Sequence, residues 1–230
     1  MPVTLITGGS SGIGAATVRE LIAKGHQVVA TGRDKDRLER LRAELSTDAL
    51  LVVAGDSADY DAVRAAVDAA VERFGRLDNA VANAGFATHD TLATGDPDRW
   101  REMVLTNVLG PAVLVKAALS ALTGSAGRIV FVGSVAGVKH TPGNMYSATK
   151  WAVTALAENT RLLVTGSGIG VTLVAPGRVD TPFWDSRPGA MPGGPALTAE
   201  DIARSIVWAL EQPPGVDVNT VVIRPVGQAV

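Results

Sequence analysis

A serine, a tyrosine and a lysine occur in one stretch of the chain, at spacings that let them act on a single ligand. Tyr146 and Lys150 are four residues apart in a helical pattern, so their side chains lie on the same face of the helix. Ser134 directly follows RIVFVG, an apolar run typical of a strand. A phenol with a pKa near ~10 is a weak acid at neutral pH unless a positive charge stabilises its phenolate. These residues therefore predict proton transfer by Tyr146, with Lys150 supplying the charge.

A glycine-rich turn near the start of the chain predicts a site for an anion. The segment TLITGGSSGIG, residues 4–14, follows an apolar run and precedes a helical pattern. Gly8, Gly12 and Gly14 allow the backbone to turn sharply and to lie close to a ligand. A helix that begins near Ile13 would direct its free N–H groups and the positive end of its dipole at that ligand. The pyrophosphate of a dinucleotide is the anion that such a turn most often binds.

Apolar runs alternate with helical patterns along the chain, and these elements must position the residues above. The near-continuous apolar character of the runs indicates strands that are buried on both faces of a parallel sheet. After a first strand that ends at Ile6, the expected strands are 27–30, 50–53, 79–82, 128–132, 170–174 and 220–223, and the expected helices are 13–24, 34–45, 59–73, 97–121, 144–164 and 199–211. Asp59 and Thr198 are the expected N-caps of the third and the last helix.

This alternation predicts one α/β domain over residues 1–230, a doubly wound parallel sheet of about seven strands with helices on both faces. Ligands of such sheets bind beyond the carboxyl ends of the strands. The stretch 183–197 is rich in Gly and Pro, which argues against a regular element there, and it is long enough to form a lid over that site.

Composition excludes several classes of protein. The chain has 230 residues, of which 47% are hydrophobic and 19% are charged, so we do not expect disorder. A formal net charge of −2 gives no basic surface for nucleic acid or for a membrane. The chain has no cysteine, and His26, His89 and His140 are not at metal-ligand spacing, so we expect no metal site. With no leader pattern and no apolar run near ~20 residues, we expect a soluble, cytoplasmic protein.

The chain resembles the short-chain dehydrogenase/reductase family, in its compact single-domain branch, over essentially its whole length. The matching motifs are TGGSSGIG at 7–14, ANAG at 82–85, Asn107 in TNVLG, Ser134, Tyr146 with Lys150, and PGRVDT at 176–181. The resemblance implies a Rossmann fold. Two features depart from the family: ANAG replaces NNAG, and Ser134 and Tyr146 are 12 positions apart, one fewer than is commonest. The second departure affects the shape of the loop between them more than the chemistry.

The resemblance also implies a catalytic set. Tyr146 would be the general acid in reduction and the general base in oxidation. Lys150 would lower the pKa of Tyr146 and hold the ribose of the nicotinamide. Ser134 would donate a hydrogen bond to the carbonyl oxygen of the substrate. Asn107 would hold a water molecule that links Lys150 to solvent.

A nicotinamide dinucleotide is the implied cofactor. Asp56 would contact the adenine amino group with Ser57 beside it, and Asn83 to Gly85 would pass under the adenosine ribose. The complete expected set is Gly8, Ser10, Ser11, Gly12, Ile13, Gly14, Arg33, Asp56, Ser57, Asn83, Ala84, Gly85, Tyr146, Lys150, Pro176, Gly177, Val179 and Thr181.

The end of the second strand predicts which dinucleotide is preferred. Folds that prefer NAD place an acid there to hold both ribose hydroxyls, and such an acid would repel a 2′-phosphate. Gly32 occupies this position, and Arg33 follows, which is able to bind phosphate through two hydrogen bonds. NADP(H) is therefore favoured, whereas Asp34, a rival ribose ligand, keeps NAD as an alternative.

The predicted activity is the interconversion of a ketone or aldehyde and its alcohol by hydride transfer. The expected substrate pocket is mostly apolar, which favours apolar or aromatic carbonyl compounds. It comprises Ser134, Val135, Ala136, His140, Met145, Phe183, Trp184 and Met191, with Gly177 beside them. Arg178 or Arg187 would instead select a carboxylate if either turned inward.

Two alternatives remain open. One is a 3-hydroxy acid or serine dehydrogenase of the same family, because the segment VNTVVIRPVGQ resembles the end of that subgroup. The other is a regulator that senses the cofactor without turnover, although such a protein would not need the Ser, Tyr, Lys and Asn set.

The resemblance further implies a homotetramer. Subunits would pair through the helices at 97–121 and 144–164, with Val113, Leu114, Leu156 and Leu163 as apolar surface, and again through the last helix and strand. We expect no partner beyond the small-molecule substrate and further copies of the chain.

Overall fold

The computed structural model describes residues 1–186 and 191–228. Seven parallel strands form one sheet in the order β3-β2-β1-β4-β5-β6-β7. The strands are β1 (Val3–Ile6), β2 (Gln27–Gly32), β3 (Leu50–Ala54), β4 (Asn79–Ala82), β5 (Arg128–Val132), β6 (Gly170–Pro176) and β7 (Thr220–Ile223). The doubly wound parallel sheet predicted from the sequence is confirmed. Its central strands are buried on both faces, which explains their unbroken apolar runs.

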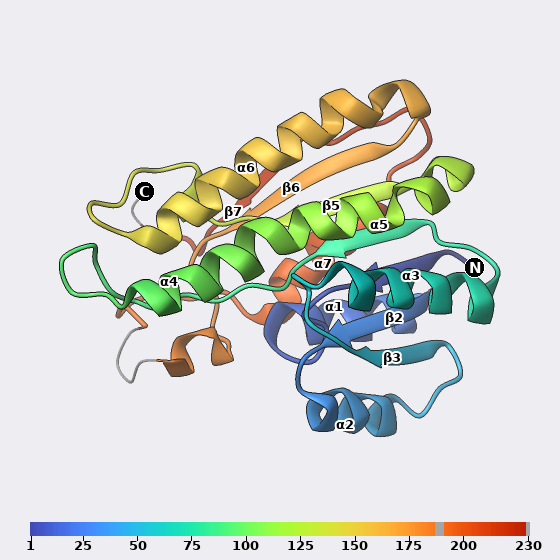
Figure 1. Ribbon diagram of the computed structural model, residues 1–230, viewed down its shortest axis with the longest axis horizontal. Coiled ribbons are helices and arrows are strands. Elements are labelled where there is room, and N and C mark those ends of the chain that lie inside the picture. Colours follow the sequence, from blue (N-terminus) through green and yellow to red (C-terminus); the bar gives the residue numbers. More distant parts are fainter. Residues whose placement is uncertain (187–190, 229–230) are drawn as a thin grey trace.

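Helices cover both faces of the sheet (Figure 1). Their bounds are α1 (Gly12–Ala23), α2 (Lys35–Leu45), α3 (Tyr60–Phe74), α4 (Pro97–Val104), α5 (Gly110–Ser125), α6 (Met145–Val164) and α7 (Ala199–Leu210). One apolar core joins α3, α5 and α6 to the sheet through residues such as Val67, Leu114 and Val153. A second core on the opposite face joins α1, α2 and α7 through residues such as Val18 and Ile206.

Capping residues begin several of these helices at the predicted positions. The Asp59 carboxylate accepts hydrogen bonds from the backbone N–H groups of Asp61 and Ala62 at the start of α3. Thr198 forms a capping box with Asp201 at the start of α7. Both predicted N-caps are confirmed.

The helix predicted as 97–121 is interrupted by a wider turn. After α4, Leu105–Leu109 form a π-helical turn, and α5 follows it directly. Within the described ranges, Pro97–Ser125 is the one helix with the length and apolarity to cross a membrane, by those criteria only. Half of its most apolar stretch is buried, and Leu114 is completely buried in the core. This burial is typical of a core helix.

The sheet order reverses between β1 and β4, and this reversal defines where a ligand binds. Chain leaving β1 turns toward α1 on one face, whereas chain leaving β4 turns toward α4 and α5 on the other. The two connections separate beyond the carboxyl ends of these strands and leave a crevice. The amino terminus lies at the other end of the strands, on the right of the view (Figure 1).

Candidate active site

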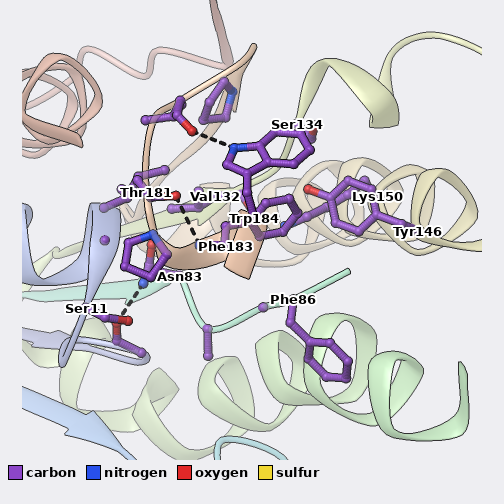
Figure 2. A pocket seen from close by; sticks show the side chains of 18 of the residues that line it. Ser11, Asn83, Phe86, Val132, Ser134, Tyr146, Lys150, Thr181, Phe183 and Trp184 are labelled. Carbon is purple, nitrogen blue, oxygen red and sulfur yellow. Dashed lines mark hydrogen bonds between the residues drawn. The ribbon is translucent and has the colours of Figure 1, made fainter. Parts of the chain in front are cut away.

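One cavity of about 790 Å³ lies beyond the carboxyl ends of the strands. Its wall brings together the glycine-rich turn after β1, the segment after β4, the end of β5, the start of α6 and the segment after β6. Figure 2 shows Tyr146, Phe183 and Trp184 toward one side of this cavity and Ser11 and Asn83 toward the other. The cofactor residues predicted from the sequence that line it are Gly8, Ser10, Ser11, Gly12, Ile13, Arg33, Ser57, Asn83, Ala84, Gly85, Tyr146, Lys150, Pro176, Gly177, Val179 and Thr181.

The glycine-rich turn fits a phosphate group. Gly8 has a φ of 66°, and a Cβ there would lie 2.8 Å from the Cα of Ala84, so the turn packs directly on the segment after β4. Asn83 holds the two together by donating to the carbonyl oxygens of Thr7 and Gly8, each at 3.0 Å. Ser11, the N-cap of α1, makes no side-chain capping bond with the described residues. The start of α1, which lies on the cavity wall, therefore has no side-chain cap from Ser11 and leaves its first N–H groups available to an anion.

Two of the expected cofactor residues lie outside the cavity lining formed by the described residues. A Cβ at Gly14 would lie 2.1 Å from the carbonyl oxygen of Gly8, so this glycine serves the close packing of turn against helix. The carboxylate of Asp56 accepts a hydrogen bond from the backbone N–H of Ala58 at 2.9 Å, which stabilises the loop after β3. Ser57, the next residue along, lines the cavity.

Ser134 and Tyr146 meet at the end of β5. The Ser134 hydroxyl accepts a hydrogen bond from the backbone N–H of Ala136 at 3.1 Å, which fixes its side chain at the start of a short 3₁₀ turn. Tyr146 lies in the first turn of α6. Burial raises the pKa of Tyr146 to about 12, whereas its hydrogen bond with Ser134 acts in the opposite direction. The phenol is therefore fully protonated at neutral pH.

Lys150 lies one helical turn after Tyr146 and is only 5% exposed. Its ammonium donates a hydrogen bond to the carbonyl oxygen of Val132 at 2.8 Å. The same nitrogen lies 5.8 Å from the centroid of the Tyr146 ring. Burial lowers the pKa of Lys150 to about 8, so the group still carries its charge at neutral pH.

Asn107 connects two segments that border the cavity. It lies in the π-helical turn and is 1% exposed. Its side-chain nitrogen donates to the carbonyl oxygen of Phe86 at 2.9 Å and to the hydroxyl of Thr149 at 3.0 Å, and its oxygen accepts from the N–H of Phe86. Both amide hydrogens are thus used, and Asn107 does not line the cavity among the described residues. The side chain therefore ties the β4–α4 loop to α6.

Comparisons with known proteins agree with this geometry. The sequence profile described as short chain dehydrogenase matches residues 2–190. The chain belongs to this family. An uncharacterised oxidoreductase of Staphylococcus saprophyticus is 34% identical over 234 residues, with 97% of each chain covered.

Two solved structures also resemble this short-chain dehydrogenase closely. One is the closed form of a serine dehydrogenase complexed with NADP+, which is 30% identical with a TM-score of 0.93, over 99% of this chain and 96% of the other. The other is an alcohol dehydrogenase from the archaeon Thermococcus sibiricus complexed with 5-hydroxy-NADP, which is 30% identical with a TM-score of 0.89, over 100% and 99%.

The substrate end of the dehydrogenase differs in part from the predicted pocket. Ser134, Val135, Ala136, Phe183 and Trp184 line the cavity together with Gly177. His140, Met145 and Met191 do not line it among the described residues, and Arg187 lies outside the described residues. His140 is exposed and stacks on Trp151, with ring centroids 5.3 Å apart.

Several residues that line the cavity were not predicted from the sequence: Phe86, His89, Lys139, Thr141 and Asn144. Lys139 to Asn144 belong to the shortened loop between Ser134 and Tyr146, whose backbone path the spacing alone does not specify. Their closeness in the sequence to Ser134 and Tyr146 was the only indication that they would line the cavity.

Part of the predicted lid forms regular secondary structure. Pro182–Ser186 form a short 3₁₀ helix, despite the Gly and Pro content of the stretch 183–197. At its far end, Leu197 pairs with Val179, and the N–H of Leu197 donates to the carbonyl oxygen of Arg178 at 2.9 Å. The far end of the lid segment is therefore anchored to the chain that leaves β6.

Two arginines line the cavity beside the end of β2. Arg33 is exposed on the cavity wall directly after β2. Asp34, the rival ribose ligand, caps α2 by accepting from the N–H of Arg37 at 2.9 Å and pairs with its guanidinium at 3.1 Å. Arg37 also lines the cavity. Arg37 was not predicted from the sequence, because the helical pattern does not specify which of its residues face the cavity.

Proposed function

We propose that this short-chain dehydrogenase interconverts a ketone or aldehyde and the corresponding alcohol, with NADP(H) as cofactor. The observation that carries the proposal is the meeting of the Ser134 and Tyr146 hydroxyls on the cavity wall, with the buried Lys150 ammonium beside them. A substrate oxygen placed between the two hydroxyls would receive a hydrogen bond from one and a proton from the other.

The chain's own residues supply proton transfer and orientation. Bound nicotinamide supplies the hydride chemistry. Tyr146 remains protonated in the ligand-free protein, which suits a general acid that gives its proton to the new alcohol oxygen. Ser134 stabilises the negative charge that develops on the carbonyl oxygen. Lys150 stabilises the phenolate left behind, and in oxidation the same charge allows Tyr146 to accept the proton.

The preference for NADP(H) is proposed on the charges at the adenosine end. Arg33 and Arg37 lie on the cavity wall where a 2′-phosphate would lie, and the carboxylate of Asp34 is already engaged by Arg37. The uncapped start of α1 and the turn at Gly8 would hold the pyrophosphate. Two of the most similar solved structures contain NADP+ or an NADP derivative, which supports the proposal.

A second candidate is the oxidation of a 3-hydroxy acid or of serine. It is favoured by the likeness to a serine dehydrogenase over 99% of the chain. Lys139 and Arg178 also line the cavity and would attract a carboxylate. Arg178, however, donates to the carbonyl oxygen of Pro195 at 3.0 Å, so its guanidinium is partly engaged by the lid.

A substrate panel tests the proposal. Purified protein is assayed with ketones, aldehydes and 3-hydroxy acids, each with NADPH or NADH and their oxidised forms, by absorbance of the reduced nicotinamide. We expect turnover of neutral carbonyl compounds with NADPH, and a smaller kcat/KM with NADH. Turnover of 3-hydroxy acids alone would favour the second candidate. Tight cofactor binding without any turnover would favour the cofactor-sensing regulator and would contradict both proposed activities, carbonyl reduction and hydroxy-acid oxidation.

A further inference from the structure

Four aromatic rings form one wall at the substrate end of the cavity. The Phe183 ring lies 5.5 Å from Tyr146, 5.1 Å from Trp184 and 5.1 Å from His89, centroid to centroid. His89 and Trp184 stack with centroids 5.0 Å apart and an interplanar angle of 22°. Figure 2 shows Phe183 and Trp184 beside Tyr146. The wall is continuous from the catalytic phenol to the β4–α4 loop.

His89 holds an unusual backbone conformation. Its φ is +54°, in the left-handed region that side chains with a Cβ rarely adopt. Among the described residues, Ser46 and Ala126 are the other non-glycine residues with positive φ, and each is the C-cap of a helix. A left-handed residue is an ordinary way to end a helix. His89 lies in a loop, so its conformation needs another reason.

The contacts of the His89 ring supply that reason. Its Nε2 lies 3.2 Å from the carbonyl oxygen of Phe183. Because a carbonyl only accepts, Nε2 carries the hydrogen and donates it. The Trp184 side chain is held by a separate hydrogen bond, in which its Nε1 donates to the carbonyl oxygen of Val179 at 2.8 Å. The strained loop and the anchored lid thus fix the Phe183 ring against Tyr146.

We propose that His89 is a specificity-determining residue, whose ring completes an aromatic wall that selects carbonyl compounds with a planar aromatic group next to the carbonyl. This inference rests on the proposed carbonyl reduction and names the substrate class of the same site. Aromatic groups pack favourably against the edges and faces of other rings.

The charges around the cavity argue for a neutral aromatic group over a cation. Lys139, Lys150 and Arg178 line it, and Asp34 at the adenosine end is the one carboxylate among the described lining residues. A cationic substrate would be repelled even though aromatic walls attract cations elsewhere.

The test compares phenyl methyl ketone with cyclohexyl methyl ketone, which have nearly the same size but differ in planarity and π-electrons. We expect the wild-type protein with NADPH to prefer the phenyl compound by about 10-fold in kcat/KM. In His89→Gly the preference should fall below about 3-fold, mainly through a higher KM for the phenyl compound. Glycine adopts the left-handed conformation freely, so the melting temperature should change by no more than about 4 °C.

Two further variants isolate the role of the ring. Asparagine tolerates positive φ and carries an amide donor but no ring, so His89→Asn should also lose the preference. The matched control is His140→Ala, because His140 is an exposed histidine that stacks on Trp151 outside the described cavity lining. This control should keep the wild-type ratio.

Any other result of these measurements contradicts either the inference about His89 or the proposed carbonyl reduction. An equal kcat/KM for both ketones in the wild type, or an unchanged ratio in His89→Gly or His89→Asn, overturns the inference while the proposed carbonyl reduction stands. Equal losses for both ketones with a large fall in melting temperature assign His89 a purely structural role and also overturn it. Failure of the wild type to reduce any carbonyl compound overturns the proposed function itself.

Discussion

The ammonium of Lys150 donates its hydrogen bond to the carbonyl oxygen of Val132, 2.8 Å away. Val132 is the last residue of β5, where β6 pairs on one side, so this strand end is fixed within the sheet. The strand thereby holds a buried charge 5.8 Å from the Tyr146 ring. Lys150 thus links the end of β5 to α6.

Removal of the Tyr146 hydroxyl should abolish most activity. Tyr146→Phe preserves ring packing against Phe183 but removes the proton donor to the substrate. We expect kcat to fall by at least about 100-fold, the range for a positioned acid–base group. Fluorescence titration should give nearly unchanged NADPH binding. A variant that keeps more than about a tenth of wild-type turnover would contradict the assigned role.

The charge of Lys150 should weaken the folded state at neutral pH. Burial lowers its pKa from 10.5 to about 8, so the folded protein releases this proton before the unfolded chain does. The cost of the buried charge is therefore fully present below pH 8 and disappears as the pH rises toward 10.5.

Urea unfolding of the wild type and of Lys150→Met measures this cost. Relative to the variant, the wild type should gain on the order of 3 kcal/mol between pH 7 and pH 10. Tyr146, with a pKa of about 12, stays protonated in both folded proteins over this range. A difference in unfolding free energy that does not depend on pH would mean that Lys150 titrates normally.

Arg33 should distinguish the two dinucleotides. We expect Arg33→Ala to weaken NADPH binding by about 1.5–3 kcal/mol, as for loss of a hydrogen bond to a charged group, and to affect NADH far less. Isothermal titration with both cofactors measures the difference. Arg64→Ala is the control, because that exposed arginine pairs with Asp68 on α3 and does not line the described cavity. Equal losses for both cofactors would place the discrimination elsewhere, with Arg37 as the next residue to change.

Asn107 should matter for stability as well as activity. Asn107→Leu removes the side-chain partner of the partly buried N–H and carbonyl of Phe86 and of the buried Thr149 hydroxyl. We expect the free energy of unfolding to fall by about 2–4 kcal/mol, the cost of unpaired buried polar groups. Asn159→Leu, at an exposed position of α6, should change it by less than about 0.5 kcal/mol. An Asn107 variant as stable as the wild type would show that the side-chain hydrogen bonds of Asn107 do not stabilise the fold.

We also propose that the protein is a homotetramer. Leu162 and Leu163 on α6 are 69% and 70% exposed, and these adjacent side chains offer apolar surface to a neighbouring copy. We expected Val113 and Leu114 at the same interface. Both side chains are instead buried in the core between α5 and the sheet. Sedimentation velocity should give four copies of the chain, and Leu163→Lys should yield smaller species. A stable wild-type monomer at micromolar concentration contradicts the proposal.

The sequence by itself determined the sheet, the glycine-rich turn and the catalytic spacing. Burial on both faces forces continuous apolar runs, so the strands were visible without any tertiary information. The turn at Gly8 and the pair Tyr146 and Lys150 are local, because one depends on a few backbone angles and the other on helical periodicity. Asp59 and Thr198 were found for the same reason, since capping involves only neighbouring residues.

Only the tertiary structure decided what faces the cavity. The π-helical turn holds the buried Asn107, Lys139 lines the cavity in place of His140, and the left-handed His89 stacks on Trp184. These features depend on how segments far apart in the chain pack together. Such contacts have no periodic signal, because each depends on how a loop packs against elements that the sequence specifies elsewhere. The chemistry is thus local to short motifs, whereas the shape of the substrate end depends on the whole fold.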